Sequence, residues 1–252
     1  MSWPTSTLDE LKAPGPRSIT DGPFGSNLAR RHYTDFGPRV VRLQNIGDGV
    51  FVDEKAHISE EHFTKLRAHE VLPGDLLVAS LGEVLPRACI APGSLGPAVV
   101  KADCIRVRLR DDVDARWVLY ALQRPSVRRW ADEHRHGVGR PRLGLKTIRR
   151  IPIPLPPLAT QRRVVAILED HLSRLDAADA GLSTIRARLV AFDRANLEKH
   201  FGNRGPTVAL GELVTDISAG RSFGGVTAPA REDEWGIIKV SAMTWGEFRP
   251  DE

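Results

Sequence analysis

The chain has 252 residues, of which 41% are hydrophobic and 27% charged, a composition typical of a globular protein with one or two domains. No stretch approaches the ~20 apolar residues that cross a bilayer, and the N-terminus lacks the basic-then-apolar order of a signal peptide. We therefore expect a cytoplasmic protein with no membrane partner.

The net charge of +4 is unevenly distributed along the chain. Residues 128–150 contain eight basic side chains against two acidic ones, so this segment alone carries +6. Such a local surplus attracts a phosphate backbone, which favours a nucleic-acid partner. A solvated basic face is the alternative.

Residues 38–109 contain short apolar runs broken by glycine and proline, a pattern typical of strands. The runs are Val40–Leu43, Leu76–Ala79, Cys89–Ile90, Val99–Val100 and the alternating Ile105, Val107 and Leu109. Within this region, residues 59–66 begin with a serine followed by two acids, which predicts a short capped helix.

Helical periodicity follows over residues 112–134, with Asp114 and Ser126 as candidate N-caps on either side of Pro125. The proline-rich run 151–158 then forbids helix and predicts an extended strut. These elements predict a mixed α+β globular domain over residues 1–157.

A long helix is predicted next, because residues 160–200 contain no proline and a single glycine. Apolar residues recur there at steps of three and four, a pattern that favours pairing with another helix. At ~1.5 Å per residue this helix would be roughly 60 Å long, too long to lie on its own domain. We assign residues 158–202 to this helical spacer, and its predicted partner face comprises Gln161, Val165, Leu168, Leu172, Leu175, Leu182, Ile185, Leu189 and Phe192.

The chain also contains an internal repeat. Residues 19–51 and 217–248 follow the same plan, and Val40–Leu43 correspond to Ile237–Val240 at an offset of 197. A period of this length is typical of a duplicated domain rather than of a solenoid unit. Residues 203–252 would therefore be the start of a second, incomplete α+β domain.

No catalytic motif is found in the sequence. Phosphate-loop, HExxH, GxSxG and strand-to-helix GxGxxG patterns are absent, and His134 and His136 lack the further ligands of a metal site. Cys89 and Cys104 are isolated, which predicts buried thiols rather than a redox pair. We expect no active site, metal or cofactor in this chain.

Two groups of residues are candidates for DNA contact. Arg42, Gln44 and Asn45 carry side chains that read base edges, although Gln44 and Asn45 could equally stabilise a strand end and turn. In the glycine- and proline-containing run 137–146, the basic side chains are suited to phosphates. The full candidate set is Arg42, Gln44, Asn45, Arg87, Arg135, Arg140, Arg142 and Lys146.

Four blocks of the chain together resemble the specificity subunit of type I DNA restriction-modification enzymes. The blocks are DGPFGSNL (21–28), VRLQNIGDGVF (41–51), LPGDLLVASLGEV (72–84) and IPIPLPPLATQRRVVAILE (151–169). The resemblance covers residues 8–202 and resumes at residue 210. It implies two target-recognition domains that bind the halves of a split site in double-stranded DNA, joined by long antiparallel helices that hold methyltransferase subunits.

The resemblance also implies that this chain is non-catalytic. S-adenosylmethionine, ATP and Mg would then be used by the partner methyltransferase and restriction subunits. Two rival interpretations remain open: a coiled-coil scaffold protein, and an inactive recognition cassette that serves as a donor for recombination.

A complete two-copy chain would need about 394 residues, twice the offset of 197, so this sequence resembles a truncated member of the family. The long helix would then lack its partner within the chain. We hypothesise that two copies form a homodimer through this helix, which would make the DNA target palindromic.

Overall fold

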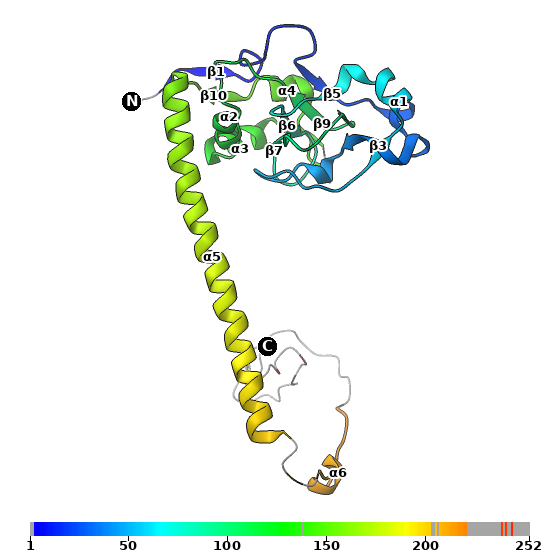
Figure 1. The fold of residues 1–252 in the computed structure, drawn as a ribbon, viewed down its shortest axis with the longest axis vertical. Coiled ribbons are helices and arrows are strands. Elements are labelled where there is room, and N and C mark those ends of the chain that lie inside the picture. The colour runs from blue at the N-terminus through cyan, green and yellow to red at the C-terminus, as the bar shows by residue number, and fades with distance from the viewer. Residues whose placement is uncertain are drawn as a thin grey trace, which may run out of the picture. The chain divides into compact units, whose positions relative to one another are not determined.

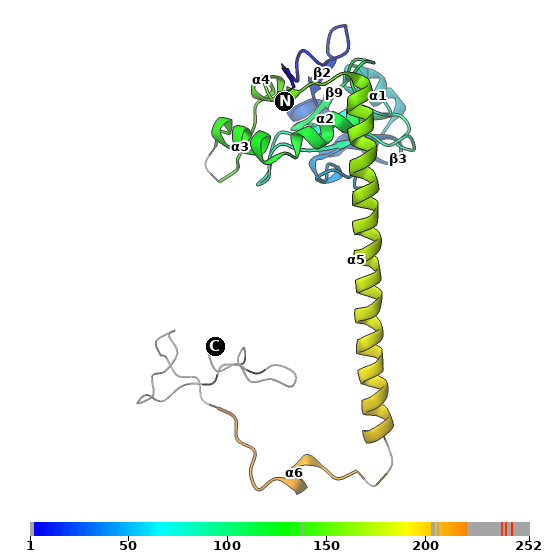
Figure 2. The same ribbon diagram turned by 90° about the vertical axis from the view of Figure 1, so that its left-hand side faces the viewer.

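The computed structural model describes residues 3–137, 139–202, 205, 207–220, 238, 240 and 243. Contacts divide the chain into two units, Met1–Leu182 and Ser183–Glu252, and helix α5 (Leu158–Phe201) begins in the first and ends in the second (Figures 1 and 2). The predicted second domain, 203–252, and the second repeat lie largely outside the described residues, which there include the short helix α6 (Leu210–Leu213). Within the first unit, the fold is α+β as predicted.

The first four-stranded sheet is antiparallel throughout. Its order is β2 (Ile19–Asp21), β9 (Cys104–Val107), β6 (Leu76–Ala79) and β7 (Arg87–Ile90). Side chains alternate between the two faces of a strand, and in β6 Leu76 and Val78 join one hydrophobic core while Leu77 and Ala79 join another. Both faces of this sheet are therefore covered, which explains why β6 is one continuous apolar run.

The second four-stranded sheet has the order β4 (His57–Ile58), β3 (Tyr33–Val41), β8 (Ala98–Val100) and β5 (Glu70–Val71). Strands β3 and β8 are parallel, and the other two pairs are antiparallel. Cys89 and Cys104 are free and buried, as predicted, and they lie between the two sheets. Burial raises the pKa of the Cys89 thiol to about 12, so this thiol stays protonated and unreactive.

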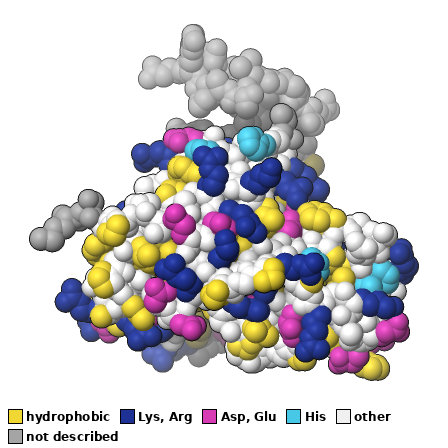
Figure 3. All heavy atoms as spheres, turned by 90° about the horizontal axis from the view of Figure 1, so that it is seen from above, with side chains coloured by type: hydrophobic (Ala, Val, Ile, Leu, Met, Phe, Trp, Pro, Cys, Tyr) yellow, Lys and Arg dark blue, Asp and Glu magenta, His cyan; other side chains and the backbone are white. Residues whose placement is uncertain are grey.

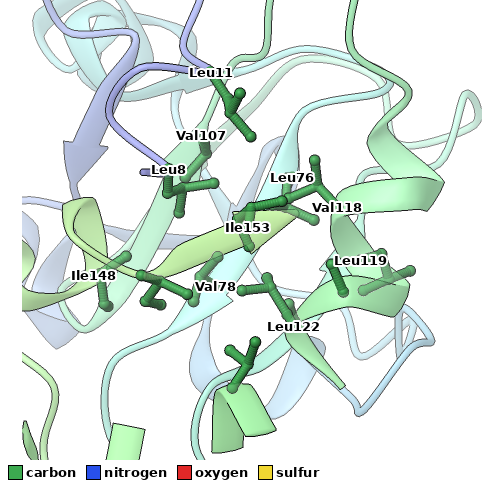
Figure 4. Packing of buried hydrophobic residues seen from close by; sticks show 14 of the residues in the cluster. Leu8, Leu11, Leu76, Val78, Val107, Val118, Leu119, Leu122, Ile148 and Ile153 are labelled. Atoms are coloured by element: carbon green, nitrogen blue, oxygen red, sulfur yellow. The ribbon is translucent and has the colours of Figure 1, made fainter. Parts of the chain in front are cut away.

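Three helices cover the other face of the first sheet and form the largest core with it (Figure 4). They are α2 (Ala115–Leu122), α3 (Pro125–His134) and α4 (Leu145–Arg149). Asp114 caps α2 as predicted, because its side chain accepts hydrogen bonds from the backbone N–H groups of Arg116 and Trp117. The prediction for Ser126 is wrong: Arg124 is the N-cap of α3, and Pro125 occupies its first turn.

Helix α1 (Glu60–Lys65) packs on the outer face of the second sheet, and Ser59 caps it as predicted. Four short 3-10 helices complete the first unit: η1 (Gly25–Leu28), η2 (Arg30–His32), η3 (Leu43–Asn45) and η4 (Arg67–His69). The first unit is thus layered as helices, sheet, sheet and helix.

A third, two-stranded sheet joins the start and the end of this domain. Strand β1 (Thr5–Thr7) pairs antiparallel with β10 (Pro152–Pro154), which is the predicted proline strut in its extended form. Prolines are tolerated there because they lack only a backbone N–H and this strand has an open edge. Ile153 between them is fully buried in the main core.

Helix α5 begins four residues after β10 and has 44 residues. Two residues predicted to face a partner helix are instead buried in the domain: Gln161 is 1% exposed and Val165 is 2% exposed. Gln161 accepts a hydrogen bond from the backbone of Asp114 and donates one to the Pro156 carbonyl. This corrects the predicted face, because the first turns of α5 belong to the core of the domain.

Candidate nucleic-acid interface

A basic loop, residues 135–144, connects α3 to α4. Arg142 fixes it by its backbone, which exchanges two hydrogen bonds of 2.9 Å with His136 and bridges to Leu81 beside β6. The Arg142 side chain adds an ion pair of 2.6 Å with Asp103 and lies over the ring of Phe24, 5.6 Å from its centre. The loop is thus anchored to the first sheet through Arg142.

Only part of the positive charge in residues 128–150 is available to a ligand. Four side chains form ion pairs: Arg128 with Asp48, Arg135 with Asp132, Arg142 with Asp103 and Arg149 with Asp9. The other four are exposed and form no ion pair with any described residue: Arg129, Arg140, Lys146 and Arg150. Among the predicted phosphate contacts, Arg140 and Lys146 are therefore the free ones, while Arg135 and Arg142 are paired.

The base-reading candidates lie elsewhere, in the turn η3 that follows β3. Asn45 is fully buried and corrects the prediction of a base contact: its side chain accepts from the Arg42 backbone and donates to the carbonyls of Val52 and Glu54. The alternative interpretation, a turn-stabilising asparagine, holds for this residue. Gln44 donates to the Glu54 carboxylate at 2.7 Å.

Arg42 and Arg87 are also held by this turn. Arg42 donates to the carbonyl of Lys55 and lies 3.8 Å from the Glu54 carboxylate, and Arg87 donates to the carbonyl of Leu43 at 3.2 Å. The structure therefore brings the candidates together as two groups. One is Arg42, Gln44, Asn45 and Arg87 around η3; the other is Arg135, Arg140, Arg142 and Lys146 around the basic loop.

Asp48 connects the segment after η3 to helices α2 and α3, although sequence reasoning did not single it out. It follows η3 in the chain, accepts a hydrogen bond from Gln123 at the end of α2 and forms an ion pair with Arg128 of α3. The adjoining glycine, Gly49, takes a positive φ of 93° at this contact, a conformation that favours glycine.

Asp21 and Gly22 in the DGPFGSNL block also hold the basic loop in place. The Asp21 carboxylate accepts hydrogen bonds from the backbone of Gly22 and of Asp103, the residue that pairs with Arg142. Burial nevertheless raises the pKa of Asp21 to about 6, and the nearby Asp103 charge adds to this effect. A Cβ at Gly22 would lie 2.1 Å from the Lys101 carbonyl carbon, so the close approach of the two segments requires glycine.

In the part of the chain that the structure describes, no group of histidine, cysteine and acidic side chains could hold a metal ion. Over the same residues, no helix is both long and apolar enough to cross a bilayer. His134, one of the two histidines of the basic segment, instead stacks on Trp130.

A sequence model described as the type I restriction modification DNA specificity domain matches residues 55–182. The chain belongs to this family. The match extends from β4 into α5 and includes the basic loop, so the two sheets and the helices α1 to α4 are largely those of a specificity domain.

Two solved structures share the fold of this specificity-domain chain. One comes from a study of complex assembly and conformational transition of the type I R-M system, with a TM-score of 0.59 and 21% identity over 80% of this chain. The other is the HsdS subunit from Thermoanaerobacter tengcongensis, with a TM-score of 0.53 and 21% identity over 80% of this chain. This chain spans about half the length of each, 46% and 45% respectively. No curated protein matches it.

Proposed function

We propose that this chain is a non-catalytic subunit that recognises a DNA sequence and directs the methyltransferase and restriction subunits of a type I restriction-modification complex to it. The observation that carries this proposal is the match of residues 55–182 to the specificity-domain family. The anchored basic loop within that match supplies exposed cations suited to a DNA backbone.

In this proposal, the two groups of candidate residues have different roles. Arg140 and Lys146 contact phosphates and position the domain on the duplex, since phosphate contacts carry no sequence information. Arg42, Gln44 and Arg87 around η3 are the candidates for base contacts, because arginine pairs with guanine and glutamine with adenine. Their present partners are an exposed carboxylate and backbone carbonyls, which a base edge can replace.

Helix α5 is the proposed site for protein partners. Leu168, Leu175, Leu182 and Leu189 recur at intervals of seven, with Ile185 and Phe192 three residues after the last two. These six side chains are between 38% and 65% exposed, and Leu172 is 43% exposed. A heptad of leucines on one helix is typical of pairing with a second helix. The partner is a methyltransferase subunit, a second copy of this chain, or both.

The cofactors of the reaction belong to the partner subunits in this proposal. S-adenosylmethionine would be held by the methyltransferase subunit, and ATP and Mg by the restriction subunit. The chain described here contributes DNA contacts and helix contacts.

The test is co-expression with the neighbouring methyltransferase subunit, followed by methylation-sensitive sequencing of the host DNA. We expect a methylated sequence motif that is lost or strongly reduced when Arg140 and Lys146 are both changed to glutamine. Arg163→Gln is the matched control, because Arg163 is exposed, lies before the leucine heptad and forms no ion pair with a described residue. A stable complex that methylates no motif would refute DNA recognition and favour the scaffold interpretation.

The homodimer is tested separately by light scattering at micromolar concentration. A dimer mass for the wild type and a palindromic motif would support it. A monomer mass for the free chain, together with a stable complex with the methyltransferase subunit, would assign the leucine heptad to that subunit instead.

A further inference from the structure

Two neighbouring hollows open on the first unit, beside the N-terminal loop and helix α1. One, of about 360 Å³, is lined by the N-terminal loop, by η4 and by β9, and its side chains include Arg17, Arg67, Arg106 and Arg108. The other, of about 560 Å³, is lined by the DGPFGSNL block, by α1 and by three histidines, His32, His62 and His69. Arg17 and Ala68 line both, so the two hollows adjoin.

The charge around these hollows is strongly positive. Glu70 is the one acidic side chain among the lining residues, whereas the basic ones are Arg17, Arg67, Arg106, Arg108 and Lys65. On the face shown in Figure 3, lysine and arginine side chains are interleaved with acidic and hydrophobic ones. A hollow lined by one sign of charge concentrates ligands of the opposite sign more effectively than a flat mixed surface.

Two of these arginines lack a carboxylate partner. Arg108 forms a bidentate pair with Asp75, and Arg67 lies 3.7 Å from Glu70, but neither Arg17 nor Arg106 forms an ion pair with any described residue. Arg106 is only 4% exposed, and its Nε has no hydrogen-bond partner within the described structure. Burial, and then the charge of Arg108, lowers the pKa of the Arg106 guanidinium, because the nearby Asp75 and Glu70 carboxylates offset these effects only in part. A bound anion would compensate the buried charge further.

The backbone holds Arg17 in place for such a ligand. Arg17 has a φ of 64°, in the left-handed region that residues other than glycine rarely adopt, and its carbonyl accepts a hydrogen bond from the Arg106 side chain. Residues held in this conformation by their surroundings are concentrated at binding sites. Arg106 thus stabilises the turn that presents Arg17 at the border of both hollows.

The pKa values of two neighbouring histidines are lowered in part by the same positive charges. The pKa of His69 is lowered first by burial and then by the charges of Arg17 and Arg106, against the effect of its hydrogen bond to the Asp21 carbonyl. The pKa of His32 is lowered first by desolvation and then by His62, Arg31 and Lys65. These neighbours keep the field around the second hollow positive.

We propose that the two hollows joined at Arg17 bind the phosphate groups of a DNA backbone, with Arg17, Arg67 and Arg106 as the phosphate ligands. This inference rests on the proposed function and adds a second backbone contact to that of the basic loop. The DGPFGSNL block touches both contacts: Pro23, Ser26 and Asn27 line the second hollow, and the Arg142 side chain lies over the ring of Phe24. Two adjoining cationic hollows suit a polyanion better than a single small ion.

The test measures binding of the full chain to a fluorescent random-sequence duplex as a function of salt concentration. Each phosphate contact adds about 0.9 to the slope of log affinity against log salt. We expect Arg17→Gln and Arg67→Gln each to lower the slope by about 0.9, whereas Arg163→Gln leaves it unchanged. Arg17 and Arg67 are exposed, so these variants keep the core intact.

A variant of opposite sign excludes a general loss of structure. Glu70→Gln removes the acidic side chain that competes for Arg67, and we expect it to strengthen DNA binding. Calorimetric titration with inorganic phosphate distinguishes the two sources of the ligand. Free phosphate that binds the wild type but not Arg17→Gln, with equal DNA slopes for both, would overturn the assignment to DNA.

Equal slopes for all variants, in a wild type that binds DNA, would overturn the inference and leave the proposed function standing. A wild-type chain that binds no DNA, and that in the methylation experiment directs no modification, would overturn both. The two failures are therefore distinguishable.

Discussion

Gln161 gives the sharpest test of how α5 is joined to the domain. The side chain is 1% exposed and makes two hydrogen bonds, from the Asp114 N–H at 2.9 Å and to the Pro156 carbonyl at 2.8 Å. Gln161→Met keeps the length of the side chain but removes both polar atoms. The Asp114 N–H and the Pro156 carbonyl then have no partner within the described structure.

The expected cost follows from these two groups. An unsatisfied buried donor or acceptor costs about 1–3 kcal/mol, so the two together cost about 2–6 kcal/mol. Apolar burial of methionine returns about 1 kcal/mol, so the free energy of unfolding should fall by about 1–5 kcal/mol. Urea unfolding followed by tryptophan fluorescence measures this, because Trp117 packs edge-to-face with Trp3 and donates to the Pro154 carbonyl next to α5. Arg163→Met, on the exposed face of the same helix, is the control and should change stability by less than about 0.5 kcal/mol.

The alternative role of Gln161, contact with a partner helix, predicts a different result. In that case Gln161→Met would change association, and its effect on unfolding would depend on protein concentration. A variant as stable as the wild type at every concentration would refute the structural role that we assign to this residue.

Three further predictions concern the DGPFGSNL block and α5. Because the pKa of Asp21 is raised to about 6, the folded state binds more protons than the unfolded state between about pH 4 and 6, and stability should fall as pH rises through this window. Asp21→Asn should abolish that dependence in urea titrations at several pH values. An unchanged pH profile would contradict the assignment. Gly22→Ala places a methyl group against the Lys101 backbone and should destabilise the fold by about 1–3 kcal/mol or more, measured by thermal unfolding. A wild-type Tm would show that the segments around Gly22 and Lys101 separate freely. The double variant Leu175→Glu, Leu182→Glu should leave the unfolding of the domain unchanged, because both side chains are exposed. It should abolish co-purification with a methyltransferase subunit or a second copy. Retained assembly would exclude the leucine heptad as the interface.

Sequence patterns predicted the elements of the first unit well where one local signal was sufficient. The continuous apolar run Leu76–Ala79 is a strand, and Ser59 and Asp114 cap the helices that follow them. Ser126 failed because a proline immediately before it provides an alternative start to the helix. Both the serine and the proline are visible in the sequence, but side-chain type alone did not decide which of them marks the start of the helix.

The candidate site was harder to predict, because exposure and pairing depend on contacts distant in the chain. Asn45 has the right side chain for a base contact, yet it is buried by residues seven and nine positions later. Half of the cations in 128–150 are neutralised by aspartates, three of which lie far away in sequence. Arg17 and Arg106 carry no sequence signal of a site, since they converge only when the N-terminal loop meets β9.

The pairing of β1 with β10 has a geometric consequence for the whole protein. Hydrogen bonds from Leu8 to Ile151, from Asp9 to Arg149 and from Leu155 to Pro4 reinforce it, so the chain leaves the domain beside the point where it entered. Neighbouring strands lie about 4.8 Å apart, so the chain ends its path through the domain, at β10, close to where it began, at β1. A loop anywhere between these strands can lengthen or shorten without moving the first residue of α5, and the origin of the helix is therefore independent of the surface that the domain presents.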